Sequence, residues 1–208
     1  MENQKRFITN ASHELKTPIA IISANAEAME LINGKNEWTG NIISQVKRLS
    51  LLINDLVLLS KIGETSAKDL TLVDTDLSEA VKSSAGSFRQ MIEDAGKTLS
   101  VEVESGIHAK VEPRLFSEIV SILLDNAVKY CDEKGTITTR LEKNKKGVIL
   151  SVSNPYQEGA SEDYERFFER FYRGDTSHNS KRSGYGIGLA MARDMARLMK
   201  GGLAVAYK

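Results

Sequence analysis

The first third of the chain carries apolar residues at three- and four-residue steps, which is the spacing of one helix face. The first series consists of Phe7, Ala11, Leu15, Ile19, Ile22, Ala26, Met29 and Ile32. It predicts one helix from Glu2 to about Ile32, which ends at residues 33–36, where Gly34 can serve as a C-terminal cap. A second series predicts another helix from about Glu37 to Ile62 and consists of Ile42, Ile43, Val46, Leu49, Ile53, Leu56 and Leu59. The short connection makes the two helices an antiparallel hairpin.

Two helices alone cannot cover so much apolar surface. We therefore expect the hairpin to dimerise into a four-helix bundle with two-fold symmetry. The alternative is that the hairpin packs against the rest of the same chain. That alternative is less favoured because the following segment begins a different pattern.

The chain beyond this hairpin mixes helical and strand patterns. Residues 63–68 are small, polar and turn-prone, so we expect a linker there between a helical domain, residues 1–62, and a second domain, residues 69–208. In the second domain Asp76 is a candidate N-cap and Pro113 a helix start. The predicted helices are 77–95, 113–130 and 187–199, and the predicted strands are 70–73, 98–104, 107–111, a hairpin over 135–154, and 203–207. This order favours an α/β sandwich, a mostly antiparallel sheet covered by helices on one face.

The amino-acid composition argues against several classes of function. The 28 Lys and Arg residues balance the 28 Asp and Glu residues, and the sequence shows no basic stripe with interleaved aromatics, which argues against a generic nucleic-acid binder. The single cysteine, Cys131, excludes an internal disulfide and a cysteine-rich zinc site, so we expect a reducing, cytoplasmic setting. No apolar run in the sequence has the length of a membrane span.

A chemically suggestive group lies near the N-terminus. His13 is followed by Glu14 and, one turn later, by Thr17 and Pro18. A neutral imidazole is a nucleophile at physiological pH, and an adjacent carboxylate can take or orient its proton. Pro18 should bend the helix locally. A surface histidine on an ordinary helix is the alternative interpretation.

Four further features fall in the second domain. Asn126 and Lys129 share a helix face, and an amide oxygen and an ammonium suit Mg²⁺ and phosphate, respectively. Asn154 ends the predicted hairpin, where a polar side chain could read a base edge. The other two features are the run Phe168–Arg173 and the glycine-rich run Gly184–Leu189, which leads into a helix whose N-terminus favours phosphate. This run matches neither a dinucleotide fingerprint nor a P-loop.

Taken together, these motifs resemble a sensor histidine kinase of bacterial two-component signalling, over nearly the whole chain. His13–Pro18 resembles the H-box of that family, Asn126–Tyr130 its N-box, Phe168–Arg173 its F-box and Gly184–Leu189 its G2 box. The resemblance implies a dimerising phosphotransfer hairpin followed by an ATP-binding domain of the Bergerat type.

The resemblance also implies site residues, cofactors and partners. His13 would accept the γ-phosphoryl group of ATP, Glu14 would assist its deprotonation, and Thr17 would orient water during dephosphorylation of the partner. ATP and Mg²⁺ would be the cofactors, a response-regulator receiver domain the partner, and the chain a homodimer. Asn126 would ligate Mg²⁺, and the other nucleotide-site residues would be Lys129, Tyr130, Asn154, Arg173, Gly184, Gly186, Gly188 and Leu189, with residues 174–183 forming part of a lid.

The chain departs from the family pattern in its G1 segment. Asn154 replaces the adenine-reading aspartate, and most of the segment's glycines are gone, so we expect ATP binding to be weakened or re-posed. Ile122 stands where the family often has a polar residue. The family pattern also leads us to expect one more strand after Lys208, and sensor and membrane segments before Met1. Two alternatives remain open: a kinase-impaired phosphatase, and a dimeric nucleotide-sensing scaffold.

Overall fold

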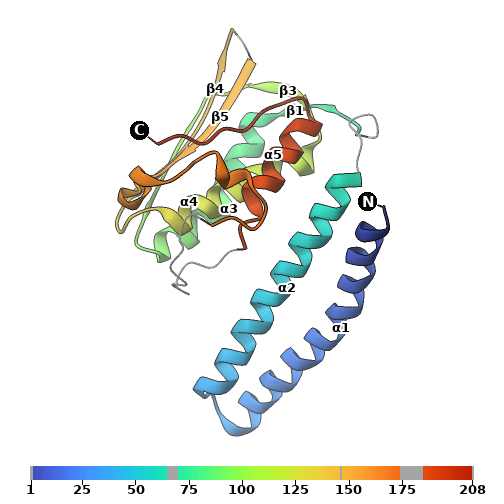
Figure 1. Cartoon of the computed structure of the whole chain (residues 1–208). Coiled ribbons are helices and arrows are strands. Elements are labelled where there is room, and N and C mark those ends of the chain that lie inside the picture. Colours follow the sequence, from blue (N-terminus) through green and yellow to red (C-terminus); the bar gives the residue numbers. More distant parts are fainter. Residues whose placement is uncertain (1, 65–69, 146, 174–184, 208) are drawn as a thin grey trace. The chain divides into compact units, whose positions relative to one another are not determined.

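The computed structural model describes residues 2–64, 70–145, 147–173 and 185–207, with the backbone alone for residues 2–14, 63, 64 and 161. The chain divides into two compact units, residues 1–64 and 65–208 (Figure 1). The first is a helical hairpin, and the second combines helices with strands. The predicted fold class, a helical hairpin followed by an α/β domain, is confirmed.

The hairpin pairs helix α1 (Glu2–Asn33) with helix α2 (Glu37–Glu64). Ile19, Val46 and Ile53 are buried together between the helices. At the tip, Thr39 donates its backbone N–H to Asn36 Oδ1 at 3.0 Å and its hydroxyl to Glu30 Oε1 at 2.9 Å. These hydrogen bonds cap α2 and join it to α1, which fixes the register of the hairpin. Among the described residues no helix is both long and apolar enough to cross a bilayer.

The second unit follows the predicted order of elements closely. Its strands are β1 (Val73–Asp76), β2 (Thr98–Val103), β3 (His108–Val111), β4 (Thr136–Asn144) and β5 (Gly147–Ser153). Its helices are α3 (Leu77–Asp94), α4 (Pro113–Tyr130) and α5 (Gly188–Leu198), with short 3-10 helices η1 (Gln157–Ser161) and η2 (Arg166–Phe168). Asp76 caps α3 by accepting the N–H of Glu79, as its position in the sequence predicts.

The strands form two small sheets. β1 pairs with β3 in the antiparallel sense, and the larger sheet has the order β2-β4-β5. In that sheet β4 runs parallel to β2 and antiparallel to β5. Helices α3 and α4 cover one face of it (Figure 1), and the core between the layers contains the fully buried Val81, Leu124, Ile137 and Leu141. Helix α4, which carries Asn126 and Lys129, is therefore anchored to the sheet.

Two predicted strand segments differ in the structure. Residues 203–207 form no strand, although their sequence alternates, because a strand also needs a hydrogen-bonded neighbour, and the ladder of β5 is built with β4 alone. The first strand begins at Val73 rather than at Leu70, where the ladder with Val111 starts. Helix α2 extends to Glu64, past the predicted end at Ile62. The predicted linker residues 65–68 lie outside the described residues.

Candidate functional site

The last two turns of α4 carry the N-box residues. Leu124 and Ala127 are buried in the core, whereas Asn126, Lys129 and Tyr130 are half-buried. The helical repeat therefore leaves the three predicted site residues at the rim of the core. Among the described residues, the Asn126 side chain has no hydrogen-bond partner.

Lys129 is engaged within its own helix. Its Nζ lies 2.5 Å from Asp125 Oδ2, one turn earlier. An acid four residues before a base is the favourable order for such a pair. Asp125 is thus a neighbour of both Asn126 and Lys129, although the sequence motifs do not assign it to the site.

The end of α4 is fastened to the segment that follows β5. The backbone N–H of Asp132 donates to Pro155 O at 3.0 Å, and Asp132 Oδ2 accepts the N–H of Gln157 at 3.0 Å. The rings of Tyr130 and Tyr156 meet edge to face, with centroids 5.7 Å apart. Asn154 is half-buried beside these contacts and donates its Nδ2 to Pro155 O at 3.1 Å. The structure therefore brings Tyr130 and Asn154 to the same junction.

The F-box run is joined to α5. Phe168 is buried, and Arg193 both donates to its backbone oxygen at 3.0 Å and places its guanidinium 4.8 Å from the ring centroid. Arg170 pairs with Asp194 at 3.2 Å. These contacts fix the chain just before the predicted lid onto the helix just after it.

The start of α5 meets α4. Ile187 stands at the N-cap and supplies no side-chain hydrogen bond to the first N–H groups of the helix. A Cβ added to Gly188 would lie 3.3 Å from Ile122 Cγ2, so a small residue suits the packing of the two helices. The first N–H groups of α5 lie next to α4, and N–H groups at a helix N-terminus can donate hydrogen bonds to an anion.

The remaining predicted site residues are only partly described. His13, Glu14 and Thr17 lie within about one turn of α1, where Thr17 is exposed and the side chains of His13 and Glu14 are not described. Arg173 is half-buried and interacts with another residue. Gly184 and the predicted lid segment 174–183 lie outside the described residues. Gly186 and Leu189 flank the start of α5. The roles assigned to all of these residues stay predictions.

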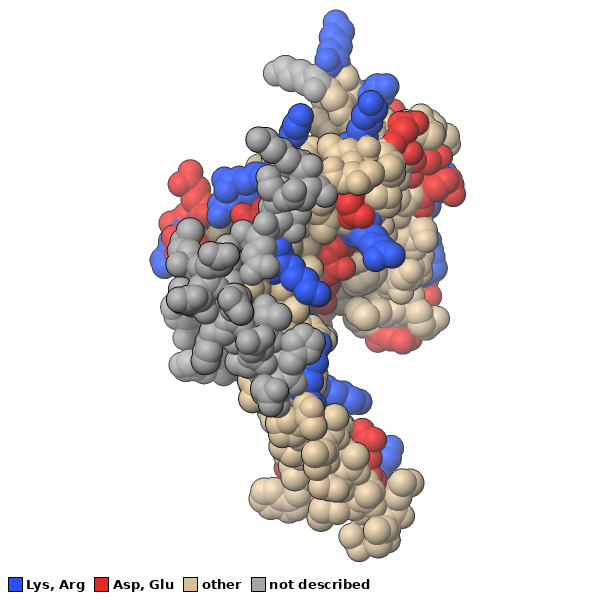
Figure 2. All heavy atoms as spheres, turned by 90° about the vertical axis from the view of Figure 1, so that its right-hand side faces the viewer, with Lys and Arg blue, Asp and Glu red and all other residues tan. Residues whose placement is uncertain are grey.

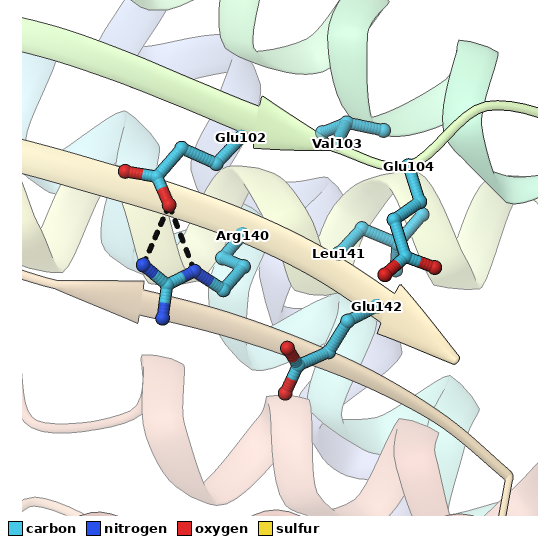
Figure 3. A pocket seen from close by; sticks show the side chains of 6 residues that line it. All are labelled: Glu102, Val103, Glu104, Arg140, Leu141 and Glu142. Atoms are coloured by element: carbon cyan, nitrogen blue, oxygen red, sulfur yellow. Dashed lines mark hydrogen bonds and ion pairs between the residues drawn. The ribbon is translucent and has the colours of Figure 1, made fainter. Parts of the chain in front are cut away.

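A separate hollow lies on β2 and β4 and contains none of the predicted site residues (Figure 3). Arg140 donates two hydrogen bonds to Glu102 Oε2, at 2.6 and 2.8 Å, and this contact raises the pKa of the guanidinium. The other lining residues are Val103, Glu104, Leu141 and Glu142. Among the described residues, no group of three or more His, Cys, Asp or Glu side chains could hold a metal ion.

Two family models match the chain. Residues 3–65 match the His Kinase A (phospho-acceptor) domain, and residues 110–207 match the histidine kinase-, DNA gyrase B- and HSP90-like ATPase family. The two matches fall on the helical hairpin and on the part of the second unit that carries α4 and α5.

Curated relatives match both units together. Sensor protein DltS of Streptococcus agalactiae is 32% identical over 201 residues, which cover 97% of this chain and 50% of DltS. Sensor histidine kinase RppB of Synechocystis sp. is 32% identical over 211 residues, covering 98% of this chain and 46% of RppB. The chain spans about half the length of the curated relatives it matches.

Solved structures share the fold. Full-length ShkA in complex with AMPPNP aligns with a TM-score of 0.76 and 21% identity, over 98% of this chain and 43% of ShkA. Acinetobacter baumannii histidine kinase AdeS aligns with a TM-score of 0.56 and 21% identity, over 89% of this chain and 86% of that one. The matched domains and relatives, in the order that the sequence motifs predict, show that this chain belongs to the family of two-component sensor histidine kinases.

Proposed function

We propose that this chain is the catalytic core of an ATP-dependent protein-histidine kinase. It transfers the γ-phosphoryl group of ATP to His13 and then passes it to an aspartate of a response-regulator receiver domain. The observation that carries the proposal is that one chain contains both a phospho-acceptor hairpin with His13 and an ATPase-type domain. In that domain α4 contacts α5, and Asp132, just after α4, bonds to the 154–157 segment.

The second unit binds the nucleotide in this proposal. The first N–H groups of α5 and the Lys129 ammonium meet the phosphates, and the Asn154 junction meets the base. Asn126 suits Mg²⁺, because its amide oxygen has no hydrogen-bond partner among the described residues and lies one helical turn from Lys129. When bound, the ion neutralises charge on the phosphate oxygens.

The hairpin supplies the nucleophile. An imidazole nitrogen of His13 forms a bond to the γ-phosphorus while the bond from that phosphorus to the β–γ bridging oxygen breaks, so ADP leaves. Glu14 takes the proton from the imidazole. Phosphotransfer to the receiver aspartate then frees His13, and Thr17 orients a water when the same core removes phosphate from the receiver domain.

The hairpin also supplies the dimer interface. Leu15, Ile22 and Met29 repeat every seven residues along α1 and are each about half exposed, at 48%, 48% and 51%. Ile42 and Leu49 repeat in the same way along α2. On the face shown in Figure 2, the hairpin carries few Lys, Arg, Asp or Glu side chains. A second copy of the chain covers these half-exposed apolar residues of α1 and α2. The dimer acts in the cytoplasm, where ATP and receiver domains are found.

A kinase-impaired phosphatase is the second candidate, and one observation favours it. Asn154 carries no charge, so its Oδ1, the amide atom not bonded to Pro155 O, is a weaker acceptor for the base than a carboxylate oxygen. A weaker base contact lowers ATP occupancy and shifts the balance from kinase to phosphatase.

Incubation with γ-labelled ATP and Mg²⁺ tests the proposal. We expect acid-labile, base-stable label on the wild-type chain, none on His13→Gln or Asn126→Ala, and unchanged label on His108→Gln, in which the substituted histidine belongs to strand β3. Label that persists in His13→Gln would contradict the assigned acceptor. Nucleotide binding without label, together with dephosphorylation of a phosphorylated receiver domain, would instead favour the phosphatase.

A further inference from the structure

Asp132 joins two segments that are distant in sequence. It follows α4 directly, is half-buried, and makes two hydrogen bonds to the segment after β5: its N–H to Pro155 O and its carboxylate to the N–H of Gln157, each at 3.0 Å. Its own backbone oxygen accepts the N–H of Gly135 at 3.1 Å. Asp132 therefore ties the end of α4 to the start of β4 and to residues 155–157.

The junction is also closely packed. A Cβ added to Gly135 would lie 2.7 Å from Pro155 Cγ, and the Tyr130 and Tyr156 rings meet on the same two segments. Contacts this tight leave the Pro155 backbone little room to shift. The position of Pro155 O is thus set by α4 and Asp132 rather than by the loop alone.

Pro155 O in turn sets the orientation of the Asn154 amide. A carbonyl oxygen can only accept, so the amide must turn its Nδ2 group toward Pro155 O, at 3.1 Å. This leaves Asn154 Oδ1 as the group that is available to a ligand, and among the described residues no donor is bonded to it. The position therefore offers an acceptor, as a carboxylate would, but without a charge.

We propose that Asp132 is a positioning residue for recognition of the adenine base, an inference that rests on the proposed kinase function. Asp132 holds residues 155–157, Pro155 O orients the Asn154 amide, and Asn154 Oδ1 accepts a hydrogen bond from the exocyclic amino group of adenine. Hypoxanthine has an acceptor oxygen at the same place, which would face Asn154 Oδ1 without a proton between them.

Binding of ADP and IDP by the full chain tests this inference. IDP loses one hydrogen bond to a neutral partner and sets two acceptors against each other, so the wild-type chain should prefer ADP by roughly three- to tenfold. Asp132→Ala should weaken ADP binding several-fold and reduce the preference to about twofold or less. Asp132→Asn keeps an acceptor for the Gln157 N–H and should retain the preference.

The matched control is Asp163→Ala. Asp163 also accepts a backbone N–H, that of Glu165 at 3.2 Å, but lies between η1 and η2. It should leave the ADP preference unchanged. Asn154→Ala should abolish the preference, and Asp132→Ala should then have no further effect on it, because the two residues act in series.

Three results would overturn the inference. If Asp132→Ala weakens the binding of ADP and IDP equally, Asp132 has only a structural role. If the wild-type chain binds ADP and IDP equally, Asn154 does not select the amino group. Both results leave the proposed kinase function intact. If the wild-type chain binds neither nucleotide, the proposed function and this inference fail together.

Discussion

Phe171 donates its backbone N–H to the oxygen of Gly186 at 2.8 Å, across the segment that the resemblance assigns to the lid. Both residues have left-handed backbone conformations, with φ of 67° at Phe171 and 68° at Gly186. This conformation is uncommon for a bulky residue, and the Phe171 side chain is 60% exposed, so its own packing does not account for it. The Gly186 contact holds the end of the F-box against the start of the G2 box.

Gly186→Ala tests that contact. An added Cβ would lie 2.8 Å from the carbonyl carbon of Phe171, in a conformation that already costs a non-glycine residue about 1–2 kcal/mol. We expect the two segments to separate and ADP affinity to fall about tenfold or more. Gly106→Ala is the matched control, because Gly106 has φ of 71° and open space around its Cβ position. Equal ADP affinity in the two variants would show that the contact does not shape the nucleotide site.

Local signals in the sequence predicted most of the helices. The Pro113 helix start and the Asp76 cap depend on neighbouring residues alone, and both lie where the sequence predicted them. The parallel pairing of β2 with β4 could not be predicted in this way, because it joins Leu99 to Ile137 through α4 rather than through a turn.

The same distinction applies to the site. The order of the motifs predicted that Asn126, Asn154 and Gly186 belong to one domain, but not which neighbours hold them. Asp132 belongs to none of these motifs, and its hydrogen bond to Gln157 spans 25 residues of sequence. His108 likewise has no carboxylate at helical spacing, yet its ring nitrogens lie 3.4 Å from Asp74 and 3.8 Å from Asp76 across a strand pair. Such contacts appear only when the register of the sheet is known.

Lys129→Ala should weaken the binding of ligands that carry phosphates, and should have little effect on ligands that carry none. A charge-assisted hydrogen bond is worth about 1.5–3 kcal/mol, so ADP affinity should fall roughly tenfold or more while adenosine affinity changes little. Lys82→Ala is the control, since Lys82 also pairs within its helix, with Glu79 at 3.0 Å. Calorimetric titration with ADP and adenosine measures both affinities. An equal loss for the two ligands would mean that Lys129 serves only its ion pair with Asp125.

Ile22→Glu should separate the dimer. Ile22 lies in the seven-residue repeat with Leu15 and Met29, and a carboxylate buried there in each copy is unfavourable. We expect the dissociation constant of the dimer to rise about 100-fold or more, equivalent to about 2.7 kcal/mol. Leu31→Glu is the control: Leu31 is 89% exposed and two residues from Met29, which turns it to roughly the opposite face of α1. Light scattering measures the mass, and a monomeric Leu31→Glu variant would contradict the assigned interface.

Cys131 should make the stability of the second unit sensitive to alkaline pH. The thiol is only 6% exposed, and burial raises its pKa, with Asp132 acting in the same direction and Lys97 opposing them. The folded chain therefore keeps the proton at a pH where the unfolded chain has lost it. The stabilisation is fully present below the ordinary pKa of a thiol and is lost as the pH rises through the raised value.

Comparison with Cys131→Ala isolates this effect from other alkaline groups, such as Tyr164, whose pKa burial also raises. The difference in unfolding free energy between wild type and Cys131→Ala should be constant at neutral pH and shrink in the alkaline range. Alkylation of the native thiol at neutral pH should be at least about tenfold slower than in denaturant, because both access and thiolate are reduced. Rapid alkylation of the native chain would show instead that Cys131 is accessible and that its proton does not contribute to folding.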